Sequence, residues 1–154
     1  MPMISENTPV AFSDPLPDAV DVVVIGAGII GTATAYYLAA RGVKVALCEK
    51  GRVAGEQSSR NWGWVRQQGR DKAELPIMME SNRLWQGLAK ETGETGLTFT
   101  ASGCAYVADT QADLAKYEAW HDLAKQHQLD TKMLTPDEVQ ALSPGMNVPC
   151  AGGM

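Results

Sequence analysis

The 154-residue sequence predicts an α/β fold, and two stretches carry the prediction. Residues 21–50, DVVVIGAGIIGTATAYYLAARGVKVALCEK, pass from a Val and Ile run through a glycine turn into a small-residue run, and then into a second apolar run. That order predicts a strand, a helix and a second strand. Residues 96–154 mix short apolar runs with helical periodicity, which is typical of an α+β region.

The glycines of the first stretch have a recognisable spacing. Gly26, Gly28 and Gly31 fit the pattern G-x-G-x-x-G between predicted strands at Val22–Ile25 and Val43–Leu47. The first glycine of this pattern allows a tight turn, the second lets the backbone approach a pyrophosphate, and the third lets the helix pack closely on the strand. The N–H groups and the positive dipole end at the helix N-terminus would face the phosphates. We therefore predict a dinucleotide-binding unit of the Rossmann type.

An acidic residue follows at the end of the second predicted strand. Glu49 lies eighteen positions after Gly31. A carboxylate at this place accepts hydrogen bonds from both ribose hydroxyls of an adenosine and disfavours the 2′-phosphate of NADP. FAD and NAD both remain open from these residues. No further strand pattern follows directly after residue 50, as it usually does in an NAD dehydrogenase, and this favours FAD.

Charge and cysteine usage exclude several classes of protein. The net charge is -5, whereas nucleic-acid and anionic-membrane binders normally carry a basic surface, so we expect a small-molecule substrate and no nucleic acid. Cys48, Cys104 and Cys150 lie far apart, and His121 and His127 are the only histidines in the sequence. Neither a metal site nor a disulfide framework is expected from this set.

Two N-terminal stretches bear on location. Residues 1–20 contain four prolines and no Lys or Arg, so they lack the basic start of a secretory or mitochondrial signal. We predict a flexible tail and a cytoplasmic protein. The apolar stretch at residues 20–40 is long enough to span a membrane, but it is interrupted by glycines. Its pattern is more typical of a strand followed by a helix. No transmembrane segment is expected.

The strand-helix-strand unit, together with EKGRVAGEQSSRN at residues 49–61, resembles the D-amino-acid oxidase-like (DAO) family of FAD-dependent oxidoreductases, which includes glycine oxidase and sarcosine oxidase. The resemblance runs from about Asp21 to the C-terminus and is looser in its later parts. It implies that FAD is the cofactor.

The resemblance also implies which residues contact FAD. Ser58 and Ser59 match a pair near the pyrophosphate and ribityl chain, and residues 61–63 match a turn beside the flavin ring. Arg52 matches a side chain that lies along the adenine, and a solvated loop arginine is the alternative interpretation. The predicted cofactor-binding set is Gly26, Gly28, Ile30, Gly31, Glu49, Lys50, Arg52, Ser58, Ser59, Arg60, Asn61 and Gly63.

The family reaction removes a hydride from the carbon that bears an amine, passes it to the flavin and leaves an imine that water hydrolyses. The resemblance implies a substrate that is an amino acid or a secondary amine with a carboxylate. The resemblance implies that Arg66 is the candidate anchor, because it lies within one position of an arginine with this role in sarcosine oxidase-like members; a solvated or structural arginine is the alternative. The planar fork of an arginine pairs with a carboxylate bidentately. Trp62 and Trp64 either line the pocket or fill space beneath the cofactor. No other catalytic residue is assigned.

The rest of the chain predicts further helices and strands. Residues 70–93 predict a helix with an apolar stripe that we interpret as core, and residues 96–109 predict two short strands joined by a turn at 101–103. Residues 110–130 predict a second helix. Residues 131–142 predict a strand, a capping box formed by Thr135 and Glu138, and a short helix. The expected apolar contacts of the two longer helices come from Leu75, Met78, Met79, Trp85 and Leu88, and from Leu114, Tyr117, Trp120 and Ala124.

Together with the resemblance to the family, these segments imply a domain organisation. We expect a tail over residues 1–20, the FAD-binding part over residues 21–95 and the beginning of a substrate-binding domain over residues 96–154. Members of the family are more than twice as long, so the chain is expected to be the truncated N-terminal part of the fold. It is then either an inactive fragment or an FAD-binding subunit that needs a partner chain to supply the missing half. An NAD-dependent dehydrogenase is the second alternative.

Overall fold

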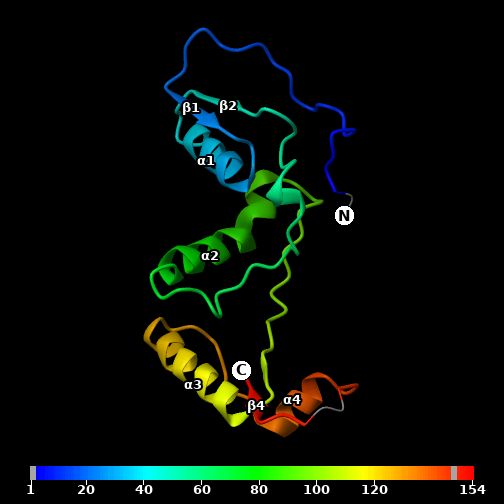
Figure 1. Cartoon of the computed structure of the whole chain (residues 1–154). Coiled ribbons are helices and arrows are strands. Elements are labelled where there is room, and N and C mark those ends of the chain that lie inside the picture. The colour runs from blue at the N-terminus through cyan, green and yellow to red at the C-terminus, as the bar shows by residue number, and fades with distance from the viewer. Residues whose placement is uncertain (1–2, 147–148) are drawn as a thin grey trace. The chain divides into compact units, whose positions relative to one another are not determined.

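The computed structural model describes residues 3–146 and 149–154 (Figure 1). The chain divides into two compact units, Met1–Trp64 and Val65–Met154, and each is described by itself. The domain boundary between residues 95 and 96 stays a prediction. Residues 1–2 of the predicted tail and residues 147–148 of the second predicted domain lie outside the described residues.

The first unit contains the predicted strand-helix-strand arrangement. Strand β1 (Val22–Ile25) and strand β2 (Val45–Cys48) are parallel and run in register from Val22 opposite Val45 to Ile25 opposite Cys48, and helix α1 (Ile29–Ala39) connects them. A short 3-10 helix, η1 (Gln57–Ser59), follows in the loop beyond β2. The α/β prediction of a Rossmann-type unit is therefore confirmed.

The second strand begins two residues later than predicted, because Val43 still belongs to the turn that follows α1. Its N–H donates to Leu38 O at 3.2 Å, while the N–H of Gly42 donates to Ala39 O at 2.9 Å. Gly42 has a φ of +83°, which a residue with a Cβ rarely adopts, so a glycine ends the helix here.

Helix α1 packs against β1 through a glycine. A Cβ added to Gly31 would lie 1.8 Å from the Gly26 carbonyl oxygen and 3.5 Å from Val24 Cγ1. The opposite face of the strands is exposed, with 57% of Val23, 88% of Ile25 and 37% of Leu47 accessible. Side chains alternate between the two faces of a strand, so one face of this sheet lies under α1 and the other is uncovered.

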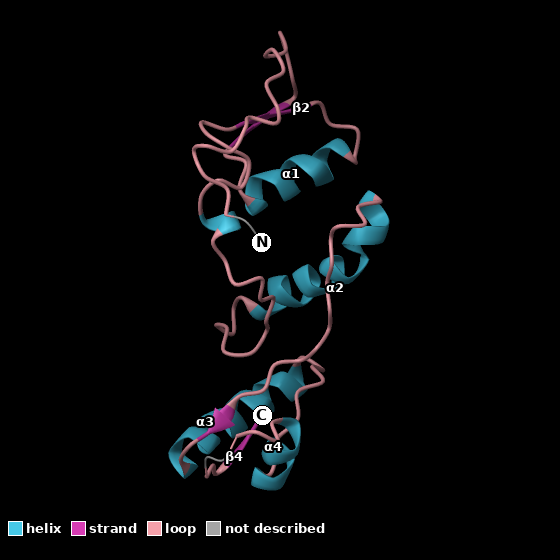
Figure 2. Cartoon of the chain, turned by 90° about the vertical axis from the view of Figure 1, so that its right-hand side faces the viewer, coloured by secondary structure: helices cyan, strands magenta, loops and turns pink. Residues whose placement is uncertain are grey.

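The second unit contains helix α2 (Leu75–Thr92), strand β3 (Val107–Ala108), helix α3 (Gln111–Gln126), helix α4 (Pro136–Leu142) and strand β4 (Gly152–Gly153) (Figure 2). Leu75 is fully buried at the start of α2, and Trp85 of the same helix stacks on Phe99 with ring centroids 6.4 Å apart. On α3, Ala124 is buried, and the other predicted apolar contacts of both helices are half-buried. The helical stripes therefore have the packing role that the sequence predicts.

Helix α4 begins with the predicted capping box. The Thr135 hydroxyl accepts a hydrogen bond from the Glu138 N–H at 3.3 Å, and the Glu138 carboxylate accepts one from the Thr135 N–H at 2.7 Å. Two N–H groups that the first helical turn leaves without a partner are satisfied in this way.

The prediction of two strands over residues 96–109 is wrong, because only Val107 and Ala108 form a strand there. The strand β3 pairs instead with β4 in an antiparallel register, and Leu134 forms an isolated bridge to Gly153. A Cβ on Gly153 would lie 2.6 Å from the Tyr106 carbonyl oxygen, so only a glycine fits between the neighbouring backbones. Because the two glycines of β4 have no side chains, the sequence lacks the β-branched and aromatic residues by which a strand is recognised.

We expect Gly31→Ala to destabilise the first unit strongly. The methyl group would overlap the Gly26 carbonyl, and relieving such overpacking typically costs about 1–3 kcal/mol or more. Gly87→Ala is the matched control, since no atom lies within 4 Å of the added Cβ on α2 and alanine favours a helix interior by roughly 1 kcal/mol. Urea unfolding of the two variants measures both effects, and equal stability of the two would contradict the packing described here.

The capping box predicts a pH dependence. The backbone N–H and then the hydroxyl of Thr135 hold the pKa of Glu138 below its ordinary value of 4.5. A carboxyl with a lowered pKa in the folded state adds stability above its unfolded pKa and loses it as the pH falls through the folded value. The free energy of unfolding of the wild type should therefore exceed that of Glu138→Gln at neutral pH, and the difference should shrink on acidification below 4.5. A difference that grows on acidification would be inconsistent with this cap.

Candidate cofactor-binding site

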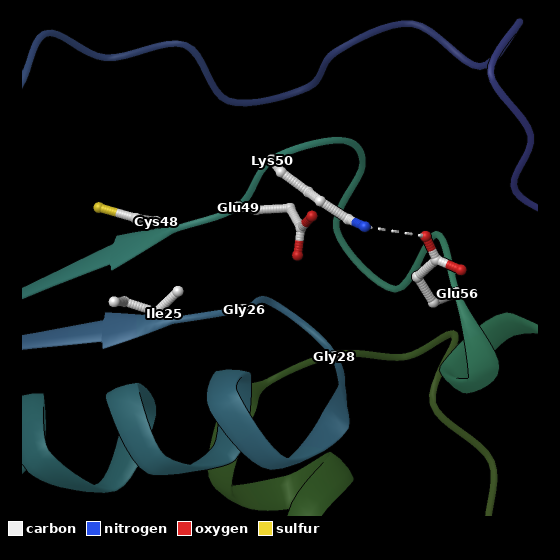
Figure 3. Close-up of a pocket in the computed structure, with 7 residues that line it drawn as sticks. All are labelled: Ile25, Gly26, Gly28, Cys48, Glu49, Lys50 and Glu56. Atoms are coloured by element: carbon white, nitrogen blue, oxygen red, sulfur yellow. Dashed lines mark ion pairs between the residues drawn. The ribbon is translucent and has the colours of Figure 1, made fainter.

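A pocket of about 390 Å³ lies at the carboxyl ends of the two parallel strands (Figure 3). Ligands of open α/β sheets bind at this edge, because the loops that follow the strands leave a crevice there. The lining residues come from the end of β1, the glycine turn, the end of β2 and the loop beyond it; they are Ile25, Gly26, Gly28, Cys48, Glu49, Lys50 and Glu56. Four of these seven belong to the predicted cofactor-binding set.

The glycine turn forms one wall of the pocket. Gly26 has a φ of +99°, and its N–H donates to Cys48 O at 2.7 Å, which ties the turn to the end of β2. A Cβ on Gly28 would lie 3.3 Å from Ser58 Oγ, so the absence of a side chain lets the next loop approach the turn closely. The structure brings the three predicted glycines together at the start of α1.

The N-terminus of α1 lies beside Ser58. Gly28 occupies the N-cap position and supplies no capping side chain, while the Ile29 N–H donates to Ser58 Oγ at 2.8 Å. The first N–H groups of a helix and its positive dipole end form an anion-binding place. Ser59 lies next to it in η1, where its hydroxyl donates to Glu56 O at 3.3 Å.

Glu49 is the carboxylate of the pocket. Its Oε2 accepts a hydrogen bond from the Ala27 N–H and its Oε1 accepts one from the Gly51 N–H, each at 2.8 Å. The Ala27 N–H first, and the Gly51 N–H second, hold the pKa of Glu49 below its ordinary value of 4.5. The group is therefore ionised at neutral pH. A carboxylate has about four acceptor positions, so the two that remain can accept hydroxyl donors.

Lys50 and Glu56 form an exposed ion pair across the pocket, with Lys50 Nζ 3.9 Å from Glu56 Oε1 (Figure 3). Exposed pairs of this kind contribute little to stability, because water screens them and two long side chains must be ordered. Glu56 is not among the site residues that the sequence predicts. Its place on the pocket wall follows from the fold of the loop, and no local signal indicates it.

The loop that follows the pocket is held by its own side chains. Asn61 Nδ2 donates to Ser58 O and Asn61 Oδ1 accepts the Gly63 N–H, both at 2.6 Å. Gly63 has a φ of +65°, so the predicted turn at residues 61–63 needs its glycine. Trp62 is 91% exposed beside it, and Ile30 on α1 is 80% exposed.

Arg52 and Arg60 do not line the pocket. The Nε and Nη2 groups of Arg52 donate to Thr8 O and Glu6 O, and Nη1 of Arg60 donates to Gly55 O and to Glu56 O. Both guanidinium groups therefore bind main-chain carbonyls in this structure.

Arg66 belongs to the second unit. Its Nη1 donates to Gln68 O at 3.1 Å and to the Tyr106 hydroxyl at 3.0 Å, and its side chain is half-buried. The backbone of Tyr106 is held by two 2.9 Å hydrogen bonds with Met154, one in each direction. The importance of Tyr106 for Arg66 was not visible in the sequence, because forty positions separate them.

The model of the family described as FAD dependent oxidoreductase matches residues 21–154. The chain belongs to this family. The resemblance to the DAO family and the prediction of FAD as the cofactor are thereby confirmed. Three features at the carboxyl edge of the strands fit the adenine dinucleotide part of FAD. They are the glycine turn, which has no side chains in the way, the N-terminus of α1 and the ionised Glu49.

Several relatives are similar to the chain. Mitochondrial sarcosine dehydrogenase of Mus musculus is 32% identical over 139 residues, and monomeric sarcosine oxidase of Arthrobacter sp. strain TE1826 is 33% identical over 140 residues. The alignments cover 88% and 84% of the chain, but 15% and 33% of the two enzymes. The mitochondrial regulatory subunit of pyruvate dehydrogenase phosphatase of Mus musculus is 30% identical over 146 residues, which cover 94% of the chain and 16% of that protein.

A solved structure agrees with these alignments. The L-amino acid deaminase of Proteus myxofaciens, determined in complex with anthranilate, has a TM-score of 0.82 and 28% sequence identity to the chain. The match covers 92% of the chain and 33% of the deaminase. The chain therefore spans a third or less of each of these four relatives.

The described residues contain neither a membrane-spanning helix nor a metal cluster. In residues 3–146 and 149–154, no helix combines the length and the apolar character needed to cross a membrane. The same residues contain no cluster of three His, Cys, Asp or Glu side chains with the geometry of a metal site. A cytoplasmic location stays a prediction.

We expect Glu49→Gln to weaken FAD binding by roughly 10- to 100-fold, the equivalent of about 1.5–3 kcal/mol for bonds to a charged group. The amide nitrogen of Gln would face the N–H of Ala27 or Gly51, and the negative acceptor would be lost. Glu56→Gln, at another lining residue of the pocket, is the control and should change the Kd by about fivefold or less. Titration of the apoprotein with FAD, followed by flavin fluorescence, measures both. Equal weakening in the two variants would remove the special role of Glu49.

Proposed function

We propose that the protein containing this chain uses FAD to oxidise the C–N bond of an amino acid or of a secondary amine that carries a carboxylate. The observation that carries the proposal is the family match over residues 21–154, joined to relatives that are named for sarcosine and for L-amino acids. Each of these compounds has an amine and a carboxylate on neighbouring positions. The chain spans a third or less of these relatives, so the activity is proposed for the whole protein.

The proposed cofactor contacts follow the geometry of the first unit. We assign the ribose hydroxyls of the adenosine to Glu49 and the pyrophosphate to the glycine turn with the N-terminus of α1. Ser58, which already accepts the Ile29 N–H, orients the loop at the phosphates. Ser59 and the turn at residues 61–63 then continue toward the ribityl chain and the flavin ring.

FAD, when bound, supplies the hydride acceptor that turns the amine into an imine, which water then hydrolyses. The chain's own contribution is to bind and orient. Glu49 and the α1 N-terminus bind one end of the cofactor by charge-assisted hydrogen bonds. The two Asn61 hydrogen bonds hold residues 58–63 in one conformation and so position the backbone beside the flavin.

Arg66 is the proposed anchor of the substrate carboxylate. Its bonds to Gln68 O and to the Tyr106 hydroxyl restrict the plane of the guanidinium group. An arginine presents its N–H donors in a planar fork, a geometry that suits a carboxylate. The strand pairing that holds the backbone of Tyr106 supports a fixed position for that hydroxyl.

We expect Arg66→Ala to raise the KM for a carboxylate-bearing amine by roughly 10- to 100-fold, and to change the KM for an uncharged amine by much less. The bidentate pair with the carboxylate is lost only for the first substrate. Steady-state kinetics on a matched pair, such as an amino acid and its decarboxylated amine, measure the effect. Equal changes for both amines would exclude Arg66 as the anchor.

We expect Tyr106→Phe to raise the same KM by a smaller factor, about tenfold or less, because the phenyl ring is kept and one hydrogen bond to Arg66 is removed. Tyr117→Phe is the matched control, since the hydroxyl of Tyr117 donates to Val107 O and the ring packs edge-on against Tyr106. It removes a hydroxyl from the same cluster without touching Arg66. The kinetic assay above distinguishes the two, and an identical effect of both variants would make the Arg66 contact irrelevant.

An FAD-binding subunit without oxidase activity of its own is the second candidate. The similarity to a regulatory subunit supports it, because that relative is aligned over 94% of the chain. In this case a partner chain would supply the substrate-binding half. Anaerobic addition of amino acids to the purified, yellow protein separates the two candidates. Loss of the flavin absorption bands supports the oxidase, whereas a spectrum that no amine changes until a partner is added supports the subunit.

A further inference from the structure

The start of the chain contacts the cofactor loop at two arginines. Residues 3–8, here called the N-terminal strap, contain a turn in which the Thr8 N–H donates to Ser5 O at 2.9 Å and the Ser5 N–H donates to Thr8 Oγ1 at 3.0 Å. These two reciprocal bonds give the strap a local structure of its own. Carbonyl groups of the strap then serve as acceptors for side chains of the loop beyond β2.

Arg52 binds the strap with its fork. Its Nε donates to Thr8 O, and its Nη2 donates to Glu6 O at 3.2 Å. Two parallel N–H groups on a planar guanidinium are suited to two neighbouring oxygens, as they are to a carboxylate. The side chain is half-buried in this contact. A lysine could not reproduce the geometry, since its ammonium group is a single point of charge.

Arg60 adds a second attachment farther along the loop. Its Nη2 donates to Ile4 O at 3.5 Å, while its Nη1 donates to Gly55 O and to Glu56 O. The strap is therefore connected to both ends of residues 52–60. All these contacts lie within the first compact unit.

The loop needs such support because its backbone is unfavourable. Ala54 has a φ of +57°, in the left-handed region that residues with a Cβ rarely adopt. A Cβ on Gly55 would lie 2.9 Å from the Arg52 carbonyl oxygen, so the turn is also tight. The same loop carries Glu56 on the pocket wall and Ser58 at the N-terminus of α1. A change in the loop would displace both groups.

We propose that the N-terminal strap clamps residues 52–60 in the conformation that binds FAD, and that Arg52 is a positioning residue of the cofactor site that acts through the strap. The Nε and Nη2 groups of Arg52 are engaged by the Thr8 and Glu6 carbonyls, and Arg52 does not line the pocket. The inference uses only the FAD site and does not depend on which amine is oxidised.

A double-mutant cycle in the full protein tests the proposal. The variants are a deletion of residues 2–9, Arg52→Ala, and the two combined, and the readout is the Kd for FAD from fluorescence titration of the apoprotein. The deletion should raise the Kd by on the order of tenfold, Arg52→Ala should raise it by no more than the deletion does, and the combination should match the deletion alone, because the deletion already removes the acceptors of Arg52. Arg41→Ala, an exposed arginine at the end of α1, is the control and should leave the Kd unchanged.

Two results would overturn the proposal. A deletion that leaves the Kd unchanged shows that the strap does not support the site. Effects that multiply in the combined variant show that Arg52 contacts FAD directly. If the deletion prevents folding, Thr8→Val and Arg52→Lys carry the same cycle, since the first removes the hydroxyl that closes the strap turn and the second removes the fork. Failure of the purified protein to oxidise any amine, with these Kd changes intact, would contradict the proposed reaction and leave the strap assignment standing.

Discussion

The bridge formed by the Glu49 carboxylate organises the first unit at its functional edge. One oxygen binds the Ala27 N–H in the turn after β1, and the other binds the Gly51 N–H in the turn after β2. The two turns are thereby joined across the ends of the parallel strands, next to the backbone bond from the Gly26 N–H to Cys48 O. Ala27 immediately precedes the N-cap of α1, and Gly51 immediately precedes residues 52–60, so the carboxylate connects the start of the helix with the start of that loop. A structural carboxylate with unused acceptor positions is at the same time a binding group, so stability and binding depend on the same residue.

Local features of the fold were predictable, and distant pairings were not. The strand-helix-strand unit follows from the spacing of Gly26, Gly28 and Gly31, and the start of α4 follows from Thr135 and Glu138, because each involves residues within a few positions of one another. The pairing of β3 with β4 was missed, since a Gly-Gly strand has neither β-branched side chains nor alternation. The start of β2 lies two residues later than predicted, because the turn after the preceding helix extends to Val43.

Among the residues of the candidate site, some were also predictable from the sequence and others were not. Glycines and Glu49 could be placed from the sequence because their roles depend on backbone conformation and charge at a fixed offset from a strand. The environment of Arg52, Arg60 and Arg66 could not, because their acceptors are main-chain carbonyls and a tyrosine hydroxyl from other segments. A carbonyl group is present at every position and gives no signal in a sequence. The roles of these arginines therefore cannot be assigned without a three-dimensional structure.

The pairing between β3 and β4 has a consequence for the order of events during synthesis. Val107 and Gly153 are opposite each other although 46 positions separate them, and helices α3 and α4 lie between them. Helices of this length can form in microseconds from contacts within a few residues. The sheet of the second unit has to wait until Met154, whose backbone bonds to Tyr106, has left the ribosome. During that interval the emerging chain exposes the unpaired edge of residues 106–108, which is the period in which a chaperone would be most useful.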